Sequence, residues 1–302
     1  MYNFKVNICF SIKNTAWGGA NQFLKALKQA FMQEGVYTDN HEDADVILFN
    51  SHQHFKEIEK IKNTYPNKLF VHRVDGPTRL YNTASDGRDE IVYKINQRIA
   101  SATVFQSDWS RQKNFSMGLK DNKPNTIVTN AADPAIFNTN HKKEKEQKVE
   151  IISTSFSRNI NKGFDVYQQL DHKLDFKKYN YTFVGNSPIS FLNIKNVGQK
   201  KSTQLASLLK KSDIYITASK NDPCSNSLIE ALSCGLTCFA LKSGGHPEIL
   251  RHKEEFLFSN IEELLKKIDL HNHQCTKISA PSYQEVCKKY LEFFKKNLIN
   301  QQ

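Results

Sequence analysis

No stretch of the 302-residue sequence approaches the roughly 20 consecutive apolar residues that a membrane-spanning helix requires. The apolar start, from Phe4 to Ser11, is short and alternating, and the polar run Lys13-Asn14-Thr15 follows it directly. This pattern predicts a first β-strand rather than a signal peptide. Glycine (12 residues) and proline (8 residues) are scarce, which excludes collagen-like and low-complexity chains.

Cysteine is uncommon and irregularly spaced, with six residues in the chain. This number and spacing indicate no disulfide framework, and we expect free thiols in a reducing, cytoplasmic compartment. The patterns Cys234-x-x-x-Cys238 and His271-x-His273-x-Cys275 contain metal-binding residue types, but neither has a recognised zinc spacing. We therefore predict no metal site.

Several familiar motifs are missing as well. The sequence contains no P-loop pattern, no G-x-G-x-x-G dinucleotide fingerprint and no arrangement that indicates a Ser-His-Asp triad. It does contain an excess of positive charge, with 42 Lys and Arg against 31 Asp and Glu, a net charge of +11. Such an excess favours phosphates, nucleic acid or an acidic membrane surface as partners without choosing among them. Nucleic-acid binding has no recognition motif to support it.

Short apolar runs alternate with amphipathic segments along the first half of the chain. The segment Ala20–Gln33, for example, places Phe23, Leu27 and Phe31 on one helical face. Further helices are predicted at Val92–Ala100 and Trp109–Met117. The predicted strands are Val6–Phe10, Val46–Phe49, Leu69–His72, Thr103–Gln106 and Thr126–Val128. This alternation predicts an α/β fold with a mostly parallel sheet.

The charged run 141–148 contains no apolar residue and predicts a linker, although an exposed loop would have the same composition. After it the alternation restarts. The predicted strands there are Val149–Ser153, Tyr181–Val184, Ile214–Thr217 and Thr237–Leu241, and the predicted helices are Leu205–Lys211, Ser227–Leu232 and Ile261–Ile268. We therefore expect two Rossmann-like doubly wound domains, residues 1–142 and 143–302, which face a central cleft.

The chain ends in an amphipathic segment, 282–299, in which Ser282 and Glu285 form a capping-box pattern. Ligands of doubly wound sheets bind at the carboxyl ends of the strands. We therefore expect the chemistry in loops that follow strands.

The most informative loop follows the predicted strand Ile214–Thr217. It leads through Asp222 into a helix that begins near Ser227 and ends at Gly235. A helix start offers backbone N–H groups and a positive dipole end to a phosphate, and Glu230 in the first turn is placed to reach ribose hydroxyls beside it. Two plainer interpretations stay open: Ser227-x-x-Glu230 as a capping box, and Asp222 as a turn residue before a proline.

Two other loops carry candidate ligand-binding residues. Arg158 and Lys162, followed by Gly163, come after the predicted strand Val149–Ser153, where two cations could neutralise a diphosphate; they could equally be solvated surface charges. Gly18 and Gly19, between the first strand and the first helix, allow close backbone approach to a ligand, or simply cap the helix.

A polar cluster, His72-Arg73-Val74-Asp75, ends the strand Leu69–His72. A histidine at such a place is either a site residue or a structural one. After the strand Thr237–Leu241, Gly244 and Gly245 make a tight loop, and Pro247 suits the first turn of a helix.

The order of these features resembles a known family. The segment from Asp222 to Glu230, the helix end 231–235 and the loop Gly244-Gly245-His246-Pro247-Glu248 look like the signature of retaining GT-B glycosyltransferases of the family 4 type. That family has Glu-x7-Glu, then a Glu-Ala-x-x-x-Gly helix and a Gly-Gly-x-Pro-Glu loop. The pair Arg158 and Lys162-Gly163 resembles its diphosphate-binding Arg…Lys-Gly. Similar matches are Asn130-Ala131-Ala132-Asp133…Phe137, Gly18-Gly19 and His72.

The resemblance implies roles for individual residues. Glu230 would bind the donor ribose, and Asp222 would contact the donor sugar and stabilise the reacting centre. Arg158 and Lys162 would hold the diphosphate, Gly19 would approach the donor phosphate, and His72 would contact the transferred sugar. Arg73 and Asp75 are candidates for the acceptor side. The backbone at the helix start would hold sugar or phosphate; its residues are Ser225, Asn226, Ser227 and Leu228.

The sequence departs from the family at Asp222, where Glu is usual, at Cys224, Ser225 and Asn226, where many members are glycine-rich, and at Ala131, where Gly is usual. The resemblance implies a metal-independent, retaining hexosyltransferase that moves a sugar from a nucleotide-sugar to a glycan or lipid-linked acceptor in cell-surface polysaccharide synthesis. No cofactor is expected. The protein would be cytoplasmic, with docking to the anionic inner face of the membrane as an option. The alternative is a nucleotide-sugar epimerase or another non-transferase on the same fold.

Overall fold

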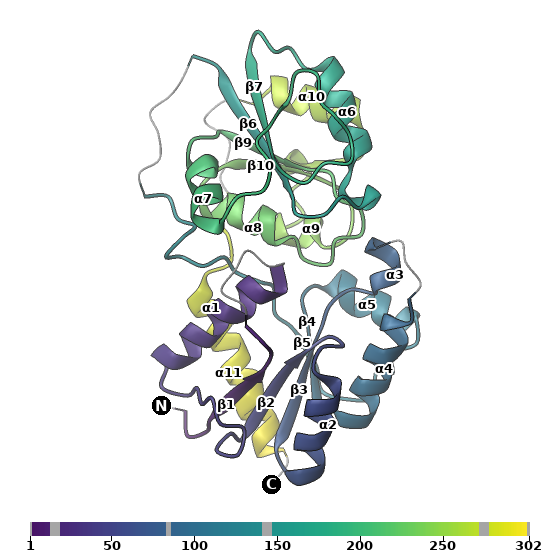
Figure 1. The fold of residues 1–302 in the computed structure, drawn as a ribbon, viewed down its shortest axis with the longest axis vertical. Helices are drawn as coiled ribbons and strands as arrows, with labels where there is room; N and C mark the ends of the chain where they lie inside the picture. Colours follow the sequence, from purple (N-terminus) through teal and green to yellow (C-terminus); the bar gives the residue numbers. More distant parts are fainter. Residues whose placement is uncertain (1, 13–18, 83–85, 141–146, 272–277, 301–302) are drawn as a thin grey trace. The chain divides into compact units, whose positions relative to one another are not determined.

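The computed structural model of the chain describes residues 2–12, 19–82, 86–140, 147–271 and 278–300. The chain divides into two compact units (Figure 1). The first contains residues 1–130 and 281–302, and the second contains residues 131–280.

The first unit is built on a parallel sheet whose five strands lie side by side in sequence order. The strands are β1 (Val6–Cys9), β2 (Val46–Asn50), β3 (Leu69–Val74), β4 (Ala102–Phe105) and β5 (Asn125–Ile127). β1 to β3 are buried along their whole length, which their near-continuous apolar sequences explain.

An additional backbone segment pairs with the outer edge of β1. Val6 N donates to Val36 O at 2.8 Å, Thr38 N donates to Val6 O at 3.0 Å, and Tyr37 forms an isolated parallel bridge with Val6. The chain therefore leaves β1 outward, touches the sheet edge at Tyr37 and returns across β1 to β2. This reversal of direction makes the unit doubly wound. The position outside β1, which a strand would occupy, has only the bridge at Tyr37.

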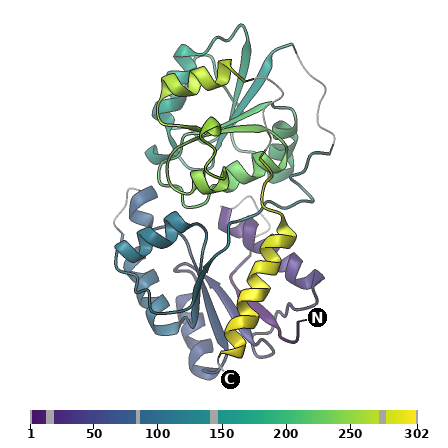
Figure 2. The same ribbon diagram turned by 180° about the vertical axis from the view of Figure 1, so that it is seen from behind.

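The helices of the first unit cover both faces of its sheet. They are α1 (Gly19–Gln33), α2 (Phe55–Thr64), α3 (Thr78–Tyr81), α4 (Arg88–Ile99), α5 (Asp108–Ser116) and α11 (Tyr283–Ile299). Neighbouring residues of β3 point to opposite faces: His72 hydrogen-bonds Asn96 of α4, whereas the Arg73 guanidinium lies over the ring of Phe23 in α1. Figure 2 shows α11, the last helix of the chain, on the α1 side.

The last helix belongs to the first unit because its aromatic stripe packs on α1. Tyr283 Oη donates to Phe23 O at 2.6 Å, and the ring of Phe31 lies 6.4 Å from that of Tyr290 and 6.0 Å from that of Phe294. The capping box predicted for Ser282 and Glu285 is confirmed.

The second unit contains a six-stranded parallel sheet in the order β11-β10-β9-β6-β7-β8. Its strands are β6 (Val149–Ser155), β7 (Tyr179–Gly185), β8 (Lys195–Asn196), β9 (Ile214–Thr217), β10 (Thr237–Leu241) and β11 (Leu257–Phe258). The chain first builds outward from β6 to β8 and then crosses to β9 and builds the other way. The order therefore reverses between β6 and β9, where ligands bind in such sheets.

The remaining elements connect these strands. They are η1 (Ile160–Lys162), α6 (Phe164–Lys173), α7 (Ser202–Lys210), α8 (Asn226–Ser233), α9 (His246–Ile249), η2 (Glu254–Phe256) and α10 (Ile261–Asp269). The units divide at residues 130 and 131 rather than within the charged run 141–148, because Phe137 packs into the core of the second unit. Residues 141–146 lie outside the described part of the chain. The predicted fold class, an α/β architecture of two Rossmann-like units, is confirmed.

The contact between α1 and α11 gives a stability prediction. Phe294 is fully buried and Ile299, on the same helix, is 60% exposed. Phe294→Ala should lower the free energy of unfolding by about 3–5 kcal/mol, because it removes a buried ring and leaves a cavity. Ile299→Ala should change it by less than about 0.5 kcal/mol. Denaturant unfolding followed by circular dichroism checks this, and equal effects of the two substitutions would contradict the packing role of α11.

Candidate functional site

Three loops of the second unit meet at the carboxyl ends of β6, β9 and β10, which are neighbours in the sheet. Backbone hydrogen bonds hold the loops together: Lys220 N donates to Asn161 O at 2.7 Å, and Gly245 N donates to Asp222 O at 2.8 Å. The loop after β9 is thus fixed to the loops on both sides of it. The residues that the sequence placed after separate strands therefore lie in one connected structure.

Two glycines make this close approach feasible. Gly163 has φ 81°, and a Cβ atom there would lie 2.2 Å from Ala218 O. Gly244 has φ 61°, and a Cβ atom there would lie 2.2 Å from Asp222 O. Both positions combine a left-handed backbone with a neighbouring carbonyl oxygen in the space of a side chain, so only glycine fits.

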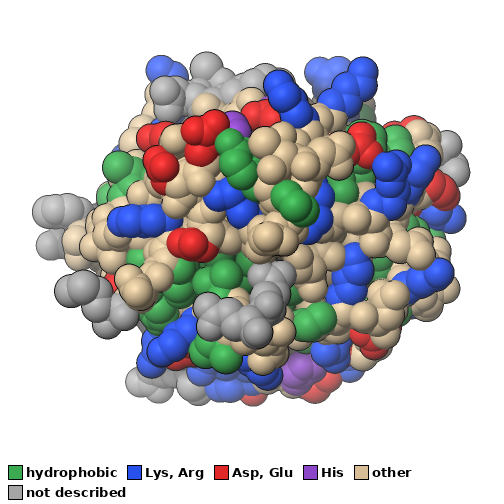
Figure 3. Space-filling view, turned by 90° about the horizontal axis from the view of Figure 1, so that it is seen from below, with side chains coloured by type: hydrophobic (Ala, Val, Ile, Leu, Met, Phe, Trp, Pro, Cys, Tyr) green, Lys and Arg blue, Asp and Glu red, His purple; other side chains and the backbone are tan. Residues whose placement is uncertain are grey.

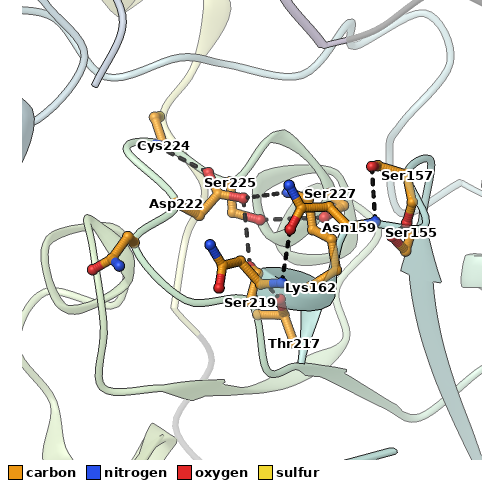
Figure 4. Close-up of polar contacts among 12 residues, drawn as sticks. Ser155, Ser157, Asn159, Lys162, Thr217, Ser219, Asp222, Cys224, Ser225 and Ser227 are labelled. Carbon is orange, nitrogen blue, oxygen red and sulfur yellow. Dashed lines mark hydrogen bonds and ion pairs between the residues drawn. The ribbon is translucent and has the colours of Figure 1, made fainter. Parts of the chain in front are cut away.

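The centre of the site is an ion pair between the first and second loops (Figure 4). Lys162 Nζ lies 3.2 Å from Asp222 Oδ2, and both side chains are largely buried. Cys224 N donates to Asp222 Oδ1 at 3.3 Å, and Ser219 Oγ lies 3.4 Å from Asp222 Oδ2. Burial alone would raise the pKa of Asp222, but Lys162, His246 and the Cys224 N–H together hold it below its ordinary value. Asp222 is therefore a carboxylate at neutral pH.

Arg158 extends the positive charge of this loop toward solvent. Its side chain is exposed and has no hydrogen bond or ion pair to any residue that the structure describes. The loop after β6 thus presents one unpaired guanidinium and one ammonium paired with Asp222. A planar guanidinium binds phosphate oxygens through parallel N–H bonds, so Arg158 is available to an anionic ligand.

The helix α8 begins one residue earlier than predicted, at Asn226, with Ser225 as its N-cap. Ser225 Oγ accepts a hydrogen bond from Leu228 N at 3.4 Å and lies 3.2 Å from Ser227 Oγ. The interpretation of Ser227-x-x-Glu230 as a capping box is therefore wrong, since Ser227 lies inside the helix. Ser225 and Leu228 are buried, whereas Asn226 and Ser227 are partly exposed at the positive end of the helix dipole.

Glu230 does not cap α8, because Ser225 is the N-cap residue of this helix. The structure gives its carboxyl group no hydrogen bond or ion pair among the described residues, although the side chain is partly buried. Desolvation raises the pKa of Glu230 to about 8. A partly buried carboxyl without a partner is costly to ionise, and donors from a ligand would remove that cost. Glu230 is therefore a carboxyl group that hydrogen-bond donors from a ligand would stabilise in its ionised form.

The predicted residues of the first unit have a different environment. His72 is fully buried; its Nε2 bonds Ser51 O at 2.8 Å, and its ring stacks on Phe49 with centroids 4.4 Å apart. With Asn96 at its other nitrogen, both ring nitrogens are engaged within the unit. The structure thus holds His72 by packing and internal hydrogen bonds, and its predicted contact with a transferred sugar stays a prediction.

Arg73 is likewise an interior residue, 1% exposed, and its predicted place on the acceptor side stays a prediction. Its guanidinium donates to Asn50 Oδ1 at 2.5 Å, to Asp75 Oδ1 at 3.1 Å and to Asn130 Oδ1 at 2.7 Å. These bonds tie together the carboxyl ends of β2, β3 and β5. Asp75 is 21% exposed and so is the member of this network that is nearest to solvent.

Two predicted glycines lie at the start of α1. Gly19 is its first residue and is exposed, whereas Gly18 lies outside the described residues. The predicted phosphate contact of this loop therefore stays a prediction. Sequence reasoning assigned no role to Ser219 or to the ring of His246, which lie beside Asp222. The available signal was a histidine within the Gly-Gly-x-Pro-Glu loop.

Metal binding and membrane insertion can be considered for the described residues only. Within them, no group of three or more His, Cys, Asp and Glu side chains could hold a metal ion. The five described cysteines are buried free thiols. None of the described helices combines the length and hydrophobicity that crossing a bilayer demands.

Gly163 and Gly198 offer a matched test of the loop contact. Both have positive φ, 81° and 68°, but a Cβ atom at Gly198 meets nothing within 4 Å. Gly198→Ala should cost only the backbone strain, about 1–2 kcal/mol. Gly163→Ala should cost clearly more, because the loop must also move away from Ala218. Thermal unfolding of the two variants checks this; equal losses would mean that the contact at Gly163 does not constrain the site.

Comparisons with known proteins agree with this architecture. Residues 137–274 match the family model of glycosyl transferases group 1. HepE from Anabaena, solved in complex with UDP-glucose, is 14% identical with a TM-score of 0.69, and the match covers 98% of each chain. A sucrose-phosphate synthase from Thermosynechococcus elongatus is 12% identical, with a TM-score of 0.68 and coverage of 98% of this chain and 95% of that one.

The catalytic domain of starch synthase IV from Arabidopsis thaliana, bound to ADP and acarbose, is 9% identical with a TM-score of 0.73; the match covers 98% of this chain and 99% of that one. A comparison with curated protein sequences gives no match. Identities this low establish the shared fold, and the family model covers most of the second unit. Residues 137–274 thus match the glycosyl transferases group 1 model, the chain has a GT-B fold, and the predicted enzyme class, a glycosyltransferase, is confirmed.

Proposed function

We propose that this protein is a retaining, metal-independent glycosyltransferase that moves a sugar from a nucleoside-diphosphate sugar to a glycan or lipid-linked acceptor in cell-surface polysaccharide synthesis. The observation that carries the proposal is the cluster at the carboxyl ends of β6 and β9. It combines an unpaired Arg158, the pair of Lys162 with Asp222, and the unpartnered Glu230. Nucleotide ligands in HepE and in starch synthase IV, proteins of the same fold, support a nucleotide donor.

The diphosphate would bind at the loop after β6 and at the start of α8. Breaking the bond between sugar and phosphate builds negative charge on the leaving nucleoside diphosphate. The groups that would stabilise that charge are Arg158, Lys162 and the positive end of α8. Preorganised cations and dipoles accelerate a reaction most when they face charge that develops in the transition state. Two protein cations at the phosphates can do the work of a divalent metal, and this is the physical basis for proposing metal independence.

Glu230 would bind the ribose of the donor. The two hydroxyl groups of a ribose are donors, and the Glu230 carboxyl group receives no hydrogen bond from the residues that the structure describes. Binding would thus ionise Glu230 and lower its pKa. The donor's own hydroxyl groups would remove the desolvation cost that the free protein carries.

Asp222 would act beside the reacting carbon of the sugar. Its low pKa keeps it ionised, so that it can stabilise the positive charge that develops at the anomeric carbon. Attack by the acceptor on the same face as the leaving phosphate would retain the anomeric configuration. The family resemblance of residues 222–248 is the support for this stereochemistry.

The distribution of surface charge bears on docking to an anionic membrane. On the face drawn in Figure 3, Lys and Arg side chains are interspersed with Asp and Glu. Such mixing gives no single-sign surface on that face for an anionic bilayer. Docking to anionic membranes therefore rests on the net charge of +11 alone.

A nucleotide panel tests the donor site directly. Thermal shift against UDP, GDP, ADP and CDP, each with EDTA, should show stabilisation by one of them. A ligand at 100 times its dissociation constant contributes about 2.7 kcal/mol. The nucleotide that stabilises names the donor base. Stabilisation that requires added Mg²⁺ would overturn metal independence, and the absence of any shift with or without metal would overturn the donor site.

Single cation variants test the diphosphate contacts. Arg158→Ala and Lys162→Ala should each weaken binding of that nucleotide by roughly ten- to a hundredfold, since a hydrogen bond to a charged group contributes about 1.5–3 kcal/mol. Lys220→Ala is the matched control: it removes one cation from the adjacent loop, where Lys220 pairs with Asp165 in an exposed position. Isothermal titration calorimetry gives the affinities. If all three variants bind equally well, the diphosphate does not lie at Arg158 and Lys162.

Glu230→Gln should stabilise the free protein and weaken nucleotide binding. The folded pKa of about 8 lies above the ordinary 4.5, so the carboxyl group costs stability progressively as pH rises through this range and no more above it. The melting temperature of the variant should therefore equal that of the wild type near pH 4 and exceed it at pH 8. The affinity of the wild type for the nucleotide should rise as the pH rises toward 8. The affinity of the variant should not rise over this range. Glu262→Gln, an exposed control carboxyl, should show neither effect. A Glu230 variant that binds nucleotide normally would exclude the ribose contact.

A further inference from the structure

The Asp222 carboxylate is connected to a second buried group that the proposed chemistry does not use. Ser219 Oγ lies 3.4 Å from Asp222 Oδ2 on one side and 3.3 Å from His246 Nε2 on the other. Ser219 is 4% exposed, and His246 is fully buried. The three side chains thus form one chain of contacts that runs from the loop after β10, across the end of β9, to the ion pair with Lys162.

The hydrogen positions in this chain follow from its ends. His246 Nδ1 lies 2.9 Å from Leu241 O, and a carbonyl oxygen can only accept, so Nδ1 carries a proton. In a neutral ring, Nε2 must then be an acceptor. The Ser219 hydroxyl has one proton, which it gives either to His246 Nε2 or to Asp222 Oδ2. Thr217 Oγ1, 3.2 Å from Ser219 Oγ, has its own proton and can donate to Ser219 in both cases.

The charge on His246 therefore decides which bond Asp222 receives. With a neutral ring, Ser219 donates to His246, and Asp222 Oδ2 depends on Lys162 alone. With a protonated ring, Nε2 donates to Ser219, and Ser219 donates to Asp222 Oδ2. Both arrangements give every member of the chain a partner while Lys162 is paired with Asp222, but only the second gives Asp222 Oδ2 a donor once Lys162 is withdrawn. The second arrangement also places a cation one hydroxyl group away from the carboxylate.

The charged groups that face His246 are Asp222 and Lys162, with opposite effects. Burial lowers the pKa of His246, Asp222 raises it and Lys162 lowers it. The neutral ring therefore prevails in the free protein at neutral pH. A diphosphate that draws Lys162 away would remove both the repulsion on His246 and the cation beside Asp222.

We propose that Ser219 and His246 are positioning residues for the Asp222 carboxylate, and that protonated His246 replaces Lys162 as the cation of Asp222 when Lys162 binds a diphosphate. The positioning itself rests on the geometry of the free protein. The exchange of cations rests on the proposed function. Through this exchange, Lys162 can bind the leaving group while Asp222 keeps a cation nearby. A buried carboxylate without a cation would cost free energy.

Nuclear magnetic resonance of ¹⁵N-histidine-labelled protein tests the chain, with His246 assigned from the spectrum of His246→Gln. In the free wild type at pH 7.5 we expect the neutral ring with its proton on Nδ1. Asp222→Asn should lower the His246 pKa, and Lys162→Gln should raise it, each by about one unit, which is tenfold in proton affinity. Lys220→Gln is the charge control and should leave it unchanged. A proton on Nε2, or a titration that is insensitive to Asp222→Asn, would overturn the positioning.

The hydroxyl group is tested separately, because a purely electrostatic effect would not need it. Ser219→Ala should remove most of the influence of Asp222→Asn on the His246 titration, and Ser219→Thr should restore it. Thermal unfolding establishes that each variant is folded, and His72 in the first unit serves as an unaffected histidine signal. Full coupling in Ser219→Ala would show that no hydrogen-bonded chain is present.

Inorganic pyrophosphate, a diphosphate without a base, tests the exchange of cations. At saturation it should raise the His246 pKa of the wild type by about one unit, and it should have no further effect in Lys162→Gln. Binding without a change at His246 would overturn the exchange. If pyrophosphate does not bind at all, the proposed diphosphate site and the exchange fail together, while the measurements on the free protein still decide the positioning by Ser219 and His246.

Discussion

Backbone contact at two glycines is the constraint on which the candidate site depends. Gly163 and Gly244 bring the loops after β6 and β10 against the loop after β9, at distances that exclude any side chain. Lys162 reaches Asp222, and His246 reaches Ser219, only because these loops touch. The positions of Lys162, Asp222 and His246 thus follow from a steric condition at two glycines.

Their different partners then give two carboxyl groups of this unit, Asp222 and Glu230, opposite properties. Asp222 is held ionised by Lys162 and by a backbone N–H, whereas Glu230, which has no partner, has its pKa raised to about 8. The same loss of water acts on both, and the difference lies in their partners. Such a division suits a site in which one carboxylate must keep its charge throughout and another gains it when a ligand arrives.

Much of this fold could be predicted from periodicity. The strands Ile214–Thr217 and Thr237–Leu241 were predicted with the observed bounds, because buried parallel strands are short continuous apolar runs. Helix α2, with a sparse apolar face, and the single bridge at Tyr37 were missed, since neither has a strong local signal. The unit boundary depended on the packing of Phe137, which composition does not reveal.

For the site, sequence order placed Arg158, Lys162 and Asp222 on loops at one edge and Glu230 in the helix that follows, and the structure brings those loops together. The histidine and arginine at the end of β3 were assigned to ligands because a strand end is a good place for a site. Their burial and internal bonds follow from the side chains of α1 and α4, which only the folded chain brings near. The contact of Ser219 with Asp222 Oδ2, at 3.4 Å, could not be predicted, because no sequence pattern distinguishes this serine from the others.

The return of α11 to the first unit also has a consequence for biosynthesis. The second unit is one continuous segment, residues 131–280, set between the two parts of the first. During translation it can complete its sheet as soon as it leaves the ribosome. The first unit, by contrast, must wait for the last helix of the chain to cover Phe23 and Phe31. Until α11 has been made, the α1 face of the first unit is an exposed aromatic surface, and such surfaces promote aggregation during synthesis.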